Sequence, residues 1–267
     1  MRALQVIPWP VKLRVSLVLS VLVIALVMFL FWLRTQPVLL LMLGTPLLIL
    51  GGYAGWCRWP RWRWGISPAL LAECPQPPQQ LARLTFDDGP TPGVTEKVLA
   101  LLQKHQLKAS FFVLLPKALQ APHLITQMVQ EGHVVALHGA DHRLPFWRKK
   151  AELTDSLQRA KQQLEALTGH AIHLYRPSHG CKNAALLAAV RTSKLQLCFW
   201  DYGVWDTDAP PPEVLLQRLQ AVTPTAESNQ PGPVVLLHDG KGDDPQVPAH
   251  APGLIAALAM WLPLLRK

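Results

Sequence analysis

Residues 84–93 read LTFDDGPTPG and join an apolar run to a turn rich in glycine and proline. An apolar run that stops at such residues is typical of a buried strand ending in a turn. Two adjacent acids, Asp87 and Asp88, stand where this strand would end. Their mutual repulsion and lost hydration cost stability unless a cation or a catalytic task separates them. From these residues alone, a helix cap or an ordinary Asp-Gly turn remains the alternative.

Beyond this stretch the chain alternates short apolar runs with longer helical patterns, as in repeated strand–helix units with a parallel sheet. Strands are predicted at residues 81–86, 109–115, 133–137, 172–175, 195–200 and 234–237. Helices are predicted at residues 94–105, 123–131, 152–168, 184–192, 212–222 and 253–265. No glycine-rich phosphate loop follows the first strand, which argues against a dinucleotide-binding fold. Polar motifs instead follow most of the strands, at the edge where an α/β barrel builds its active site.

His138 and His142 follow the third predicted strand and lie four positions apart. Two histidines at this spacing converge on one metal ion if the segment makes a helical turn, although such a pair is often incidental. Asp88 would complete a set of two imidazoles and one carboxylate, with one position open to water. This set suits catalytic zinc, and iron(II), cobalt and manganese are the alternatives.

These motifs resemble those of the NodB-type polysaccharide deacetylases, the family-four carbohydrate esterases, over about residues 81–262. The resemblance implies an α/β fold, an incomplete (β/α) barrel of six or seven strands. It also implies one divalent metal ion, most often zinc, and hydrolysis of N-acyl groups on amino sugars. In the family's pattern the first acid, here Asp87, is the general base. The second acid, Asp88, binds the metal together with His138 and His142.

Three further motifs carry the rest of the resemblance. The motif RPSHG begins at Arg176, and the resemblance implies that this arginine holds Asp87 while a backbone N–H near His179 faces the reacting carbonyl oxygen. The next motif ends at Asp206, in the position whose acid keeps the catalytic histidine protonated. LLHD closes the series with His238 as the general acid. Taken singly, Arg176 would be a buried ion pair and Asp206 a surface acid.

Four positions depart from the family's pattern. Gly139 stands where serine or threonine is usual, so one loop-stabilising hydroxyl is missing. Ser178 and His179 replace Pro-Tyr, and Thr207 replaces a tryptophan. The changes beside the groove put substrate preference in doubt more than the chemistry. Four other histidines lie in helical or loop contexts, where we expect solvated side chains: His105, His123, His170 and His250.

The first 74 residues differ in composition from the rest of the chain. Residues 15–33 form a 19-residue apolar run relieved only by two serines. At about 1.5 Å per residue, this run spans a hydrocarbon core of about 30 Å. A second apolar run, residues 38–56, is interrupted by glycines and a proline. We therefore predict a transmembrane helical hairpin and a multi-pass protein of the cell membrane, with a single pass as the alternative.

Much of the formal charge of +9 lies in this first part, which holds seven Lys/Arg and one acid. The remaining residues lack the strongly basic balance of a nucleic-acid-binding domain. A segment of alternating tryptophan and arginine at residues 56–64 fits an aromatic belt beside a membrane better than a stacking platform for nucleic acid. The four cysteines form no C-x-x-C pair and neither require nor exclude an oxidising compartment.

We thus predict a membrane anchor at residues 1–74, a linker at 75–80 and a catalytic domain at 81–267. The predicted function is metal-dependent removal of N-acyl groups from an N-acetylated glycan of the cell envelope, such as peptidoglycan. One alternative is the same chemistry on a lipid-linked sugar at the cytoplasmic membrane face, which the positive charge on both flanks of the hairpin favours. Another is a catalytically inactive glycan-binding module on a membrane anchor. We expect no nucleic acid and no obligate protein partner.

Overall fold

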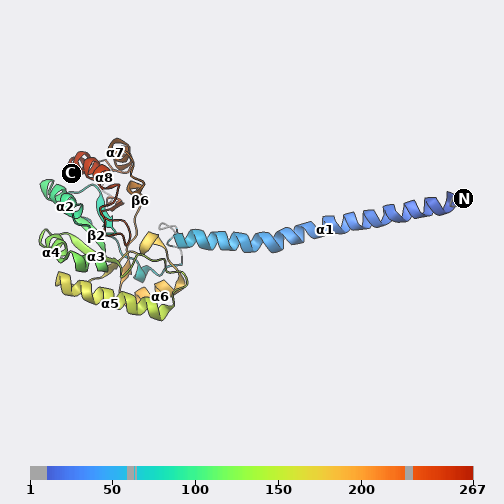
Figure 1. Cartoon of the computed structure of the whole chain (residues 1–267), viewed down its shortest axis with the longest axis horizontal. Helices are drawn as coiled ribbons and strands as arrows, with labels where there is room; N and C mark the ends of the chain where they lie inside the picture. The colour runs from blue at the N-terminus through green and yellow to red at the C-terminus, as the bar shows by residue number, and fades with distance from the viewer. Residues whose placement is uncertain (1–10, 59–62, 64, 226–230, 267) are drawn as a thin grey trace, which may run out of the picture. The chain divides into compact units, whose positions relative to one another are not determined.

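The computed structural model describes residues 11–58, 63, 65–225 and 231–266. The chain divides into two compact units, Met1–Gly55 and Trp56–Lys267. The described part of the first unit is helical and belongs to α1 (Val11–Arg58), a single helix of 48 residues (Figure 1).

The predicted helical hairpin is wrong, because α1 continues without interruption from the first apolar run into the second. Residues 34–37, where the turn is predicted, contain no glycine or asparagine to end a helix in a left-handed cap. Pro37 alone does not end the helix, since a helix can accommodate a proline by a local adjustment. Across the described residues, no helix combines the length and the apolar character that crossing a membrane requires.

The second unit contains a parallel sheet of seven strands in the order β5-β4-β3-β2-β1-β7-β6. The strands are β1 (Arg83–Asp87), β2 (Ala109–Leu114), β3 (Val134–Gly139), β4 (Leu174–Tyr175), β5 (Gln196–Leu197), β6 (Tyr202–Gly203) and β7 (Val234–His238). β1 lies between β2 and β7 and all of its residues are buried, as in the interior strands of a parallel sheet. β5 and β6 form the two edges of the described sheet and do not pair with each other, so the sheet stays open between them. This is the incomplete barrel predicted from the sequence.

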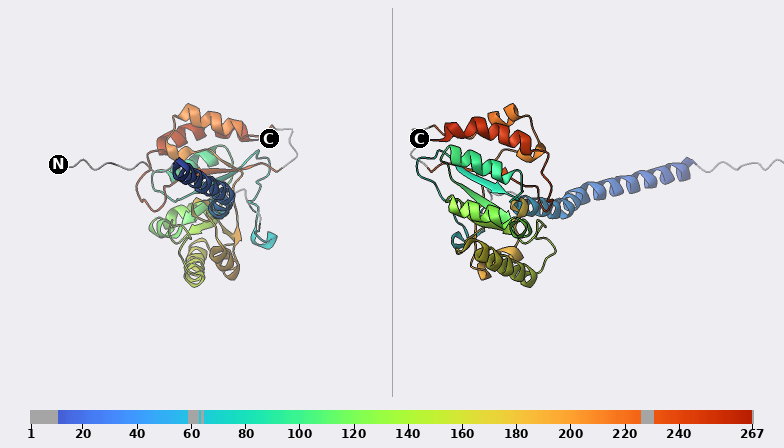
Figure 2. Two further views of the ribbon diagram at one scale, coloured as in Figure 1. Left: turned by 90° about the vertical axis from the view of Figure 1, so that its right-hand side faces the viewer. Right: turned by 60° about the vertical axis from the view of Figure 1, so that its left-hand side comes forward.

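Helices flank the sheet. They are α2 (Thr95–Lys104), α3 (Leu115–Gln120), α4 (Pro122–Gln130), α5 (Lys150–Thr168), α6 (Ala184–Thr192), α7 (Pro212–Ala221) and α8 (Ala251–Trp261). Neighbouring helices pack in the order α7, α8, α2, α4, α5 and α6, which follows the order of the strands beside them (Figures 1 and 2). The predicted helices agree with these bounds to within two residues, except that the last ends in a 3₁₀ turn (Leu262–Leu265). The short elements α3 and β6 were not predicted.

The segment that precedes β1 packs into the same unit. Leu70 is buried in its core, and a disulfide joins Cys74 to Cys198, the residue that follows β5. The compact unit begins at Trp56. The predicted start of the catalytic domain at residue 81 therefore falls inside a packed unit, and the segment before it supplies part of the core.

Candidate active site

Asp87 ends β1 and Asp88 follows it at a φ of 70°, in the left-handed region that residues other than glycine rarely occupy. The two buried carboxylates therefore have different partners. Asp87 Oδ1 accepts a hydrogen bond from Arg176 Nη1 at 2.8 Å. Asp88 Oδ1 lies 3.2 Å from Nε2 of His138 and 3.2 Å from Nε2 of His142. The strand end thus presents one acid to a guanidinium and the other to two imidazoles.

Asp88, His138 and His142 offer one carboxylate oxygen and two ring nitrogens that lie within 4.8 Å of one another. Asp88 Oδ1 is buried and has no hydrogen-bond donor among the described residues, as expected of an atom that faces a cation. Three protein ligands of this kind are typical of catalytic zinc sites and also bind iron(II), cobalt or manganese. The residues present therefore fit one divalent metal ion.

The electrostatics of this cluster also favour a cation. Burial alone would raise the pKa of Asp88, but its contacts with His138 and His142 outweigh burial and hold that pKa well below its usual value. Burial would lower the pKa of His142, whereas the neighbouring Asp88, Asp243 and Asp87 raise it overall. A metal ion held by this cluster would stabilise the ionised Asp88 directly.

Arg176 follows β4 and is completely buried, and each of its five N–H groups has an acceptor. Nη1 donates to Asp87 Oδ1 and to Thr85 Oγ1, both at 2.8 Å. Nε donates to the carbonyl of Cys198 at 3.0 Å. Nη2 donates to the next carbonyl along the chain at 3.3 Å and faces the disulfide sulfur of Cys74 at 3.7 Å. This arginine is therefore fixed in position and in turn fixes Asp87.

His238 ends β7, and Asp206 opens a 3₁₀ turn (Asp206–Asp208). His238 Nδ1 lies 3.0 Å from Asp206 Oδ1, and Asp206 Oδ2 accepts from the His238 backbone N–H at 2.8 Å. Burial alone would lower the pKa of His238, but the charge and hydrogen bond of Asp206, with weaker contributions from Asp88 and Asp87, raise it to about 9. At neutral pH this histidine therefore carries the proton that a general acid needs. Because His238 is paired with Asp87 in the register of β7 and β1, the two acid–base groups are neighbours.

Comparison with known proteins agrees with this geometry. A sequence profile of the family "Polysaccharide deacetylase" matches residues 75–198. The chitooligosaccharide deacetylase of Bradyrhizobium sp. is 33% identical over 159 residues, which cover 59% of this chain and 69% of that protein. The chain belongs to the polysaccharide deacetylase family. It is therefore a hydrolase of the carbohydrate esterase type.

Two further proteins resemble this deacetylase over a larger share of its chain. The peptidoglycan-N-acetylglucosamine deacetylase of Bacillus cereus is 29% identical over 189 residues, which cover 71% of this chain and 83% of that protein. A crystal structure of a peptidoglycan N-acetylglucosamine deacetylase superposes with a TM-score of 0.59 at 25% identity, covering 72% of this chain and 85% of that one. These matches confirm the family and the fold predicted from the sequence.

Contacts to the three candidate metal ligands also come from residues that the sequence did not single out. Gly242 donates its N–H to Asp88 Oδ2 at 2.8 Å, and the Asp243 carboxylate accepts from the His142 N–H at 3.0 Å. The buried Lys117 of α3 donates from Nζ to the Asp88 carbonyl at 2.9 Å. The only sequence signal for the first two is the run GKGDD, close behind the last motif. Such residues are usual in any loop.

Two histidines outside the predicted set lie close to the site. His179 is exposed at a φ of 56°, and its ring centroid lies 4.4 Å from that of His142. It therefore borders the open side of the cluster. His250 is buried, with Nε2 3.0 Å from the His238 carbonyl oxygen, so its prediction as a solvated side chain is wrong. Its burial arises from the packing of the segment before α8 against the end of β7, which local sequence does not reveal.

Proposed function

We propose that this deacetylase removes N-acetyl groups from amino sugars of a cell-envelope polysaccharide such as peptidoglycan, with one divalent metal ion, zinc being favoured. The observation that carries the proposal is a three-ligand metal cluster beside two acid–base groups of opposite charge, Asp87 and His238. The names of the relatives point to the same substrate class, since they are deacetylases of peptidoglycan and of chitooligosaccharides.

The reaction adds water to the amide carbonyl and breaks the C–N bond, giving acetate and a free sugar amine. A bound metal ion would polarise the carbonyl and lower the pKa of water. Asp87 accepts the proton of the attacking water, and Arg176 holds its carboxylate in position through the hydrogen bond to Oδ1. His238 gives the proton on Nε2 to the departing nitrogen, because its Nδ1 faces Asp206. The two groups thus begin the cycle in opposite protonation states.

The test is acetate release from purified peptidoglycan and from N-acetylated chitooligosaccharides, with free amines counted in parallel. We expect acetate and amine in equal amounts from the wild-type protein. His238→Ala should reduce the rate by roughly 10²–10⁴-fold, whereas His170→Ala, at an exposed position, should not. Metal-loaded wild-type protein that binds these glycans without releasing acetate would instead favour an inactive glycan-binding module.

We propose further that the catalytic unit works in an oxidising compartment. The disulfide between Cys74 and Cys198 supports this placement, because such bonds persist outside the reducing cytosol. It favours a glycan of the envelope over a lipid-linked sugar at the cytoplasmic face. A reporter enzyme that is active only after export should be active when it is fused after Lys267. Activity of a reporter that works only in the cytosol, fused at the same position, would contradict the proposal.

We also propose that the first unit attaches the protein to a membrane. The 19-residue apolar run supports this, as do the large apolar side chains of α1 that are exposed, Val21, Phe29, Trp32 and Leu48 among them. An exposed apolar surface of this extent marks an interaction site. The full-length protein should remain with membranes during alkaline carbonate extraction, and its recovery in the soluble fraction would contradict the proposal.

A further inference from the structure

The loop HGADH, from His138 to His142, carries two of the three proposed metal ligands. Its Gly139 has a φ of 150°, and a Cβ at this position would lie 2.8 Å from the carbonyl oxygen of Asp141. The serine or threonine that the family resemblance leads one to expect here would therefore strain this loop. Other groups hold it in place.

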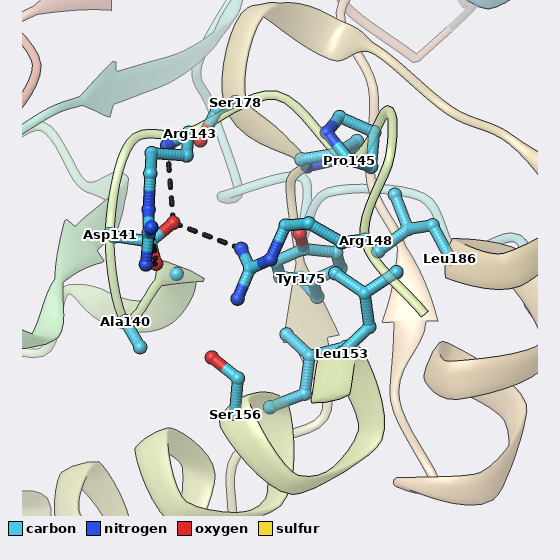
Figure 3. Close-up of a pocket in the computed structure, with 13 residues that line it drawn as sticks. Ala140, Asp141, Arg143, Pro145, Arg148, Leu153, Ser156, Tyr175, Ser178 and Leu186 are labelled. Carbon is cyan, nitrogen blue, oxygen red and sulfur yellow. Dashed lines mark hydrogen bonds and ion pairs between the residues drawn. The ribbon is translucent and has the colours of Figure 1, made fainter. Parts of the chain in front are cut away.

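The carboxylate of Asp141, between the two histidines, supplies the contacts that hold the loop. Its Oδ1 accepts from the Arg143 backbone N–H and from Arg148 Nη1, each at 3.1 Å. Its Oδ2 accepts from Nε and Nη2 of Arg143 at 3.2 and 2.9 Å. Arg148 also donates from Nε to Glu152 of α5 at 2.7 Å. Figure 3 shows Asp141 between the two arginines. Arg148 therefore ties the metal-ligand loop to the first turn of α5.

The two arginines differ in their surroundings. The Arg143 side chain is 72% exposed, whereas that of Arg148 is 15% exposed. Arg148 lines a cavity of about 20 Å³ together with Leu153 and Tyr175 (Figure 3). An exposed ion pair contributes little, because water competes for both charges. The partly buried Asp141–Arg148 pair is thus the stronger restraint on the loop, and Arg148 reaches α5 through the more exposed Glu152.

We propose that Asp141 and Arg148 are positioning residues for the metal centre, which hold the loop so that both imidazoles aim at one ion. On the other side, the Asp243 carboxylate accepts from the His142 N–H at 3.0 Å, so His142 is restrained from two directions. The inference rests on the proposed metal site and concerns its affinity. Groups that orient metal ligands typically change metal affinity by about 10–100-fold when they are removed.

If Arg148 acted only through its charge, its removal would change metal affinity in the opposite direction from the change expected for a positioning residue. Removing a cation near the site would, through electrostatics alone, strengthen the binding of another cation. Removing a positioning group would weaken it, because binding then has to order the loop as well. Arg148→Met separates the two effects, since it removes the guanidinium while keeping an apolar stem in the cavity wall.

The experiment measures zinc affinity by competition with a chromophoric chelator, with thermal melting recorded in parallel. We expect Arg148→Met to bind zinc about 10–100-fold more weakly than wild type. Arg148→Lys should also bind more weakly, because an ammonium cannot reproduce the bridge between Asp141 and Glu152. Arg159→Met is the matched control, since Arg159 forms an exposed ion pair with Asp155 within α5. It should bind zinc as wild type does.

Zinc binding by folded Arg148→Met that is unchanged or tighter would overturn the inference and leave the proposed function intact. If that variant does not fold, Arg148→Lys decides in its place, and wild-type affinity in it would overturn the inference. Wild-type protein that binds no zinc would overturn the metal centre and the inference together.

Discussion

Two adjacent carboxylates at the end of β1 can perform different tasks because each has its own partner. Asp87→Asn keeps the size of the side chain and an acceptor for Arg176, but an amide cannot serve as a base here. We expect the metal to stay bound while the rate of acetate release falls by roughly 10²–10⁴-fold. Metal content and turnover at saturating substrate, measured on the same preparation, check this expectation.

Asp88→Asn is the matched variant. It should weaken metal affinity first, because Asp88 supplies the anionic ligand, and added metal should partly restore the rate. The roles assigned to the two acids would be reversed if added metal restored Asp87→Asn and had no effect on Asp88→Asn.

His238 acts as an acid only while protonated, so the rate should fall as the pH rises through its pKa, which Asp206 helps to raise to about 9. Asp206→Asn should move this fall toward lower pH, in the direction of the ordinary value of 6.5.

The same pair of residues makes the stability of the fold depend on pH. Because the pKa of His238 is higher in the folded than in the unfolded chain, the His238–Asp206 pair stabilises the fold fully below pH 6.5 and loses this contribution as the pH rises through about 9. Profiles of rate and of unfolding free energy against pH test both points. Superimposable profiles for variant and wild type would contradict the assignment.

The loop at residues 240–244 contacts the candidate metal ligands through Gly242, whose N–H donates to Asp88 Oδ2. This glycine has a φ of 46°, and a Cβ there would lie 3.0 Å from His142 Nδ1. Gly169, which follows α5, has a φ of 70° and no neighbour within 4 Å of such a Cβ. Alanine at either position should cost about 1–2 kcal/mol of stability through left-handed strain. Only Gly242→Ala should also weaken zinc binding, as measured by chelator competition. Equal zinc affinity in both variants would contradict the role of the loop.

The sequence predicts those elements whose signals are local. β1 is a continuous apolar run ended by turn residues, and α6 follows Asn183, whose side chain caps it by accepting from the Leu186 N–H. The seven predicted site residues lie at strand ends or shortly after them, and parallel strands bring those ends to one edge. The hairpin prediction fails because hydropathy marks apolar runs and does not show whether the helix between them ends.

Other features depend on residues far apart in the chain. Four cysteines allow three pairings even when all are bonded, and the observed bond joins residues separated by 124 positions. Nothing in the run GKGDD shows that the Gly242 N–H faces Asp88. Such contacts arise only after the sheet has formed, so spacing and composition could not reveal them.

At the scale of the molecule, the start of the second unit at Trp56 can be tested by truncation. A chain of residues 56–267 should fold and release acetate from soluble oligosaccharides. A chain of residues 81–267 lacks Cys74 and the buried Leu70. It should be less stable by about 4–5 kcal/mol from the lost cross-link alone. Thermal melting compares the two, and equal stability and activity would contradict the structural role of residues 56–80.

The decisive measurement for the proposed reaction is the dependence of hydrolysis on the metal ion. Protein stripped of metal by a chelator is titrated with zinc while acetate release from an N-acetylated chitooligosaccharide is followed. The rate should rise from near zero and reach its plateau at one equivalent of zinc per chain, and His142→Ala should show neither the binding nor the rise. Acetate release that is independent of metal, or an absence of release with one zinc ion bound, would contradict metal-dependent deacetylation at this site.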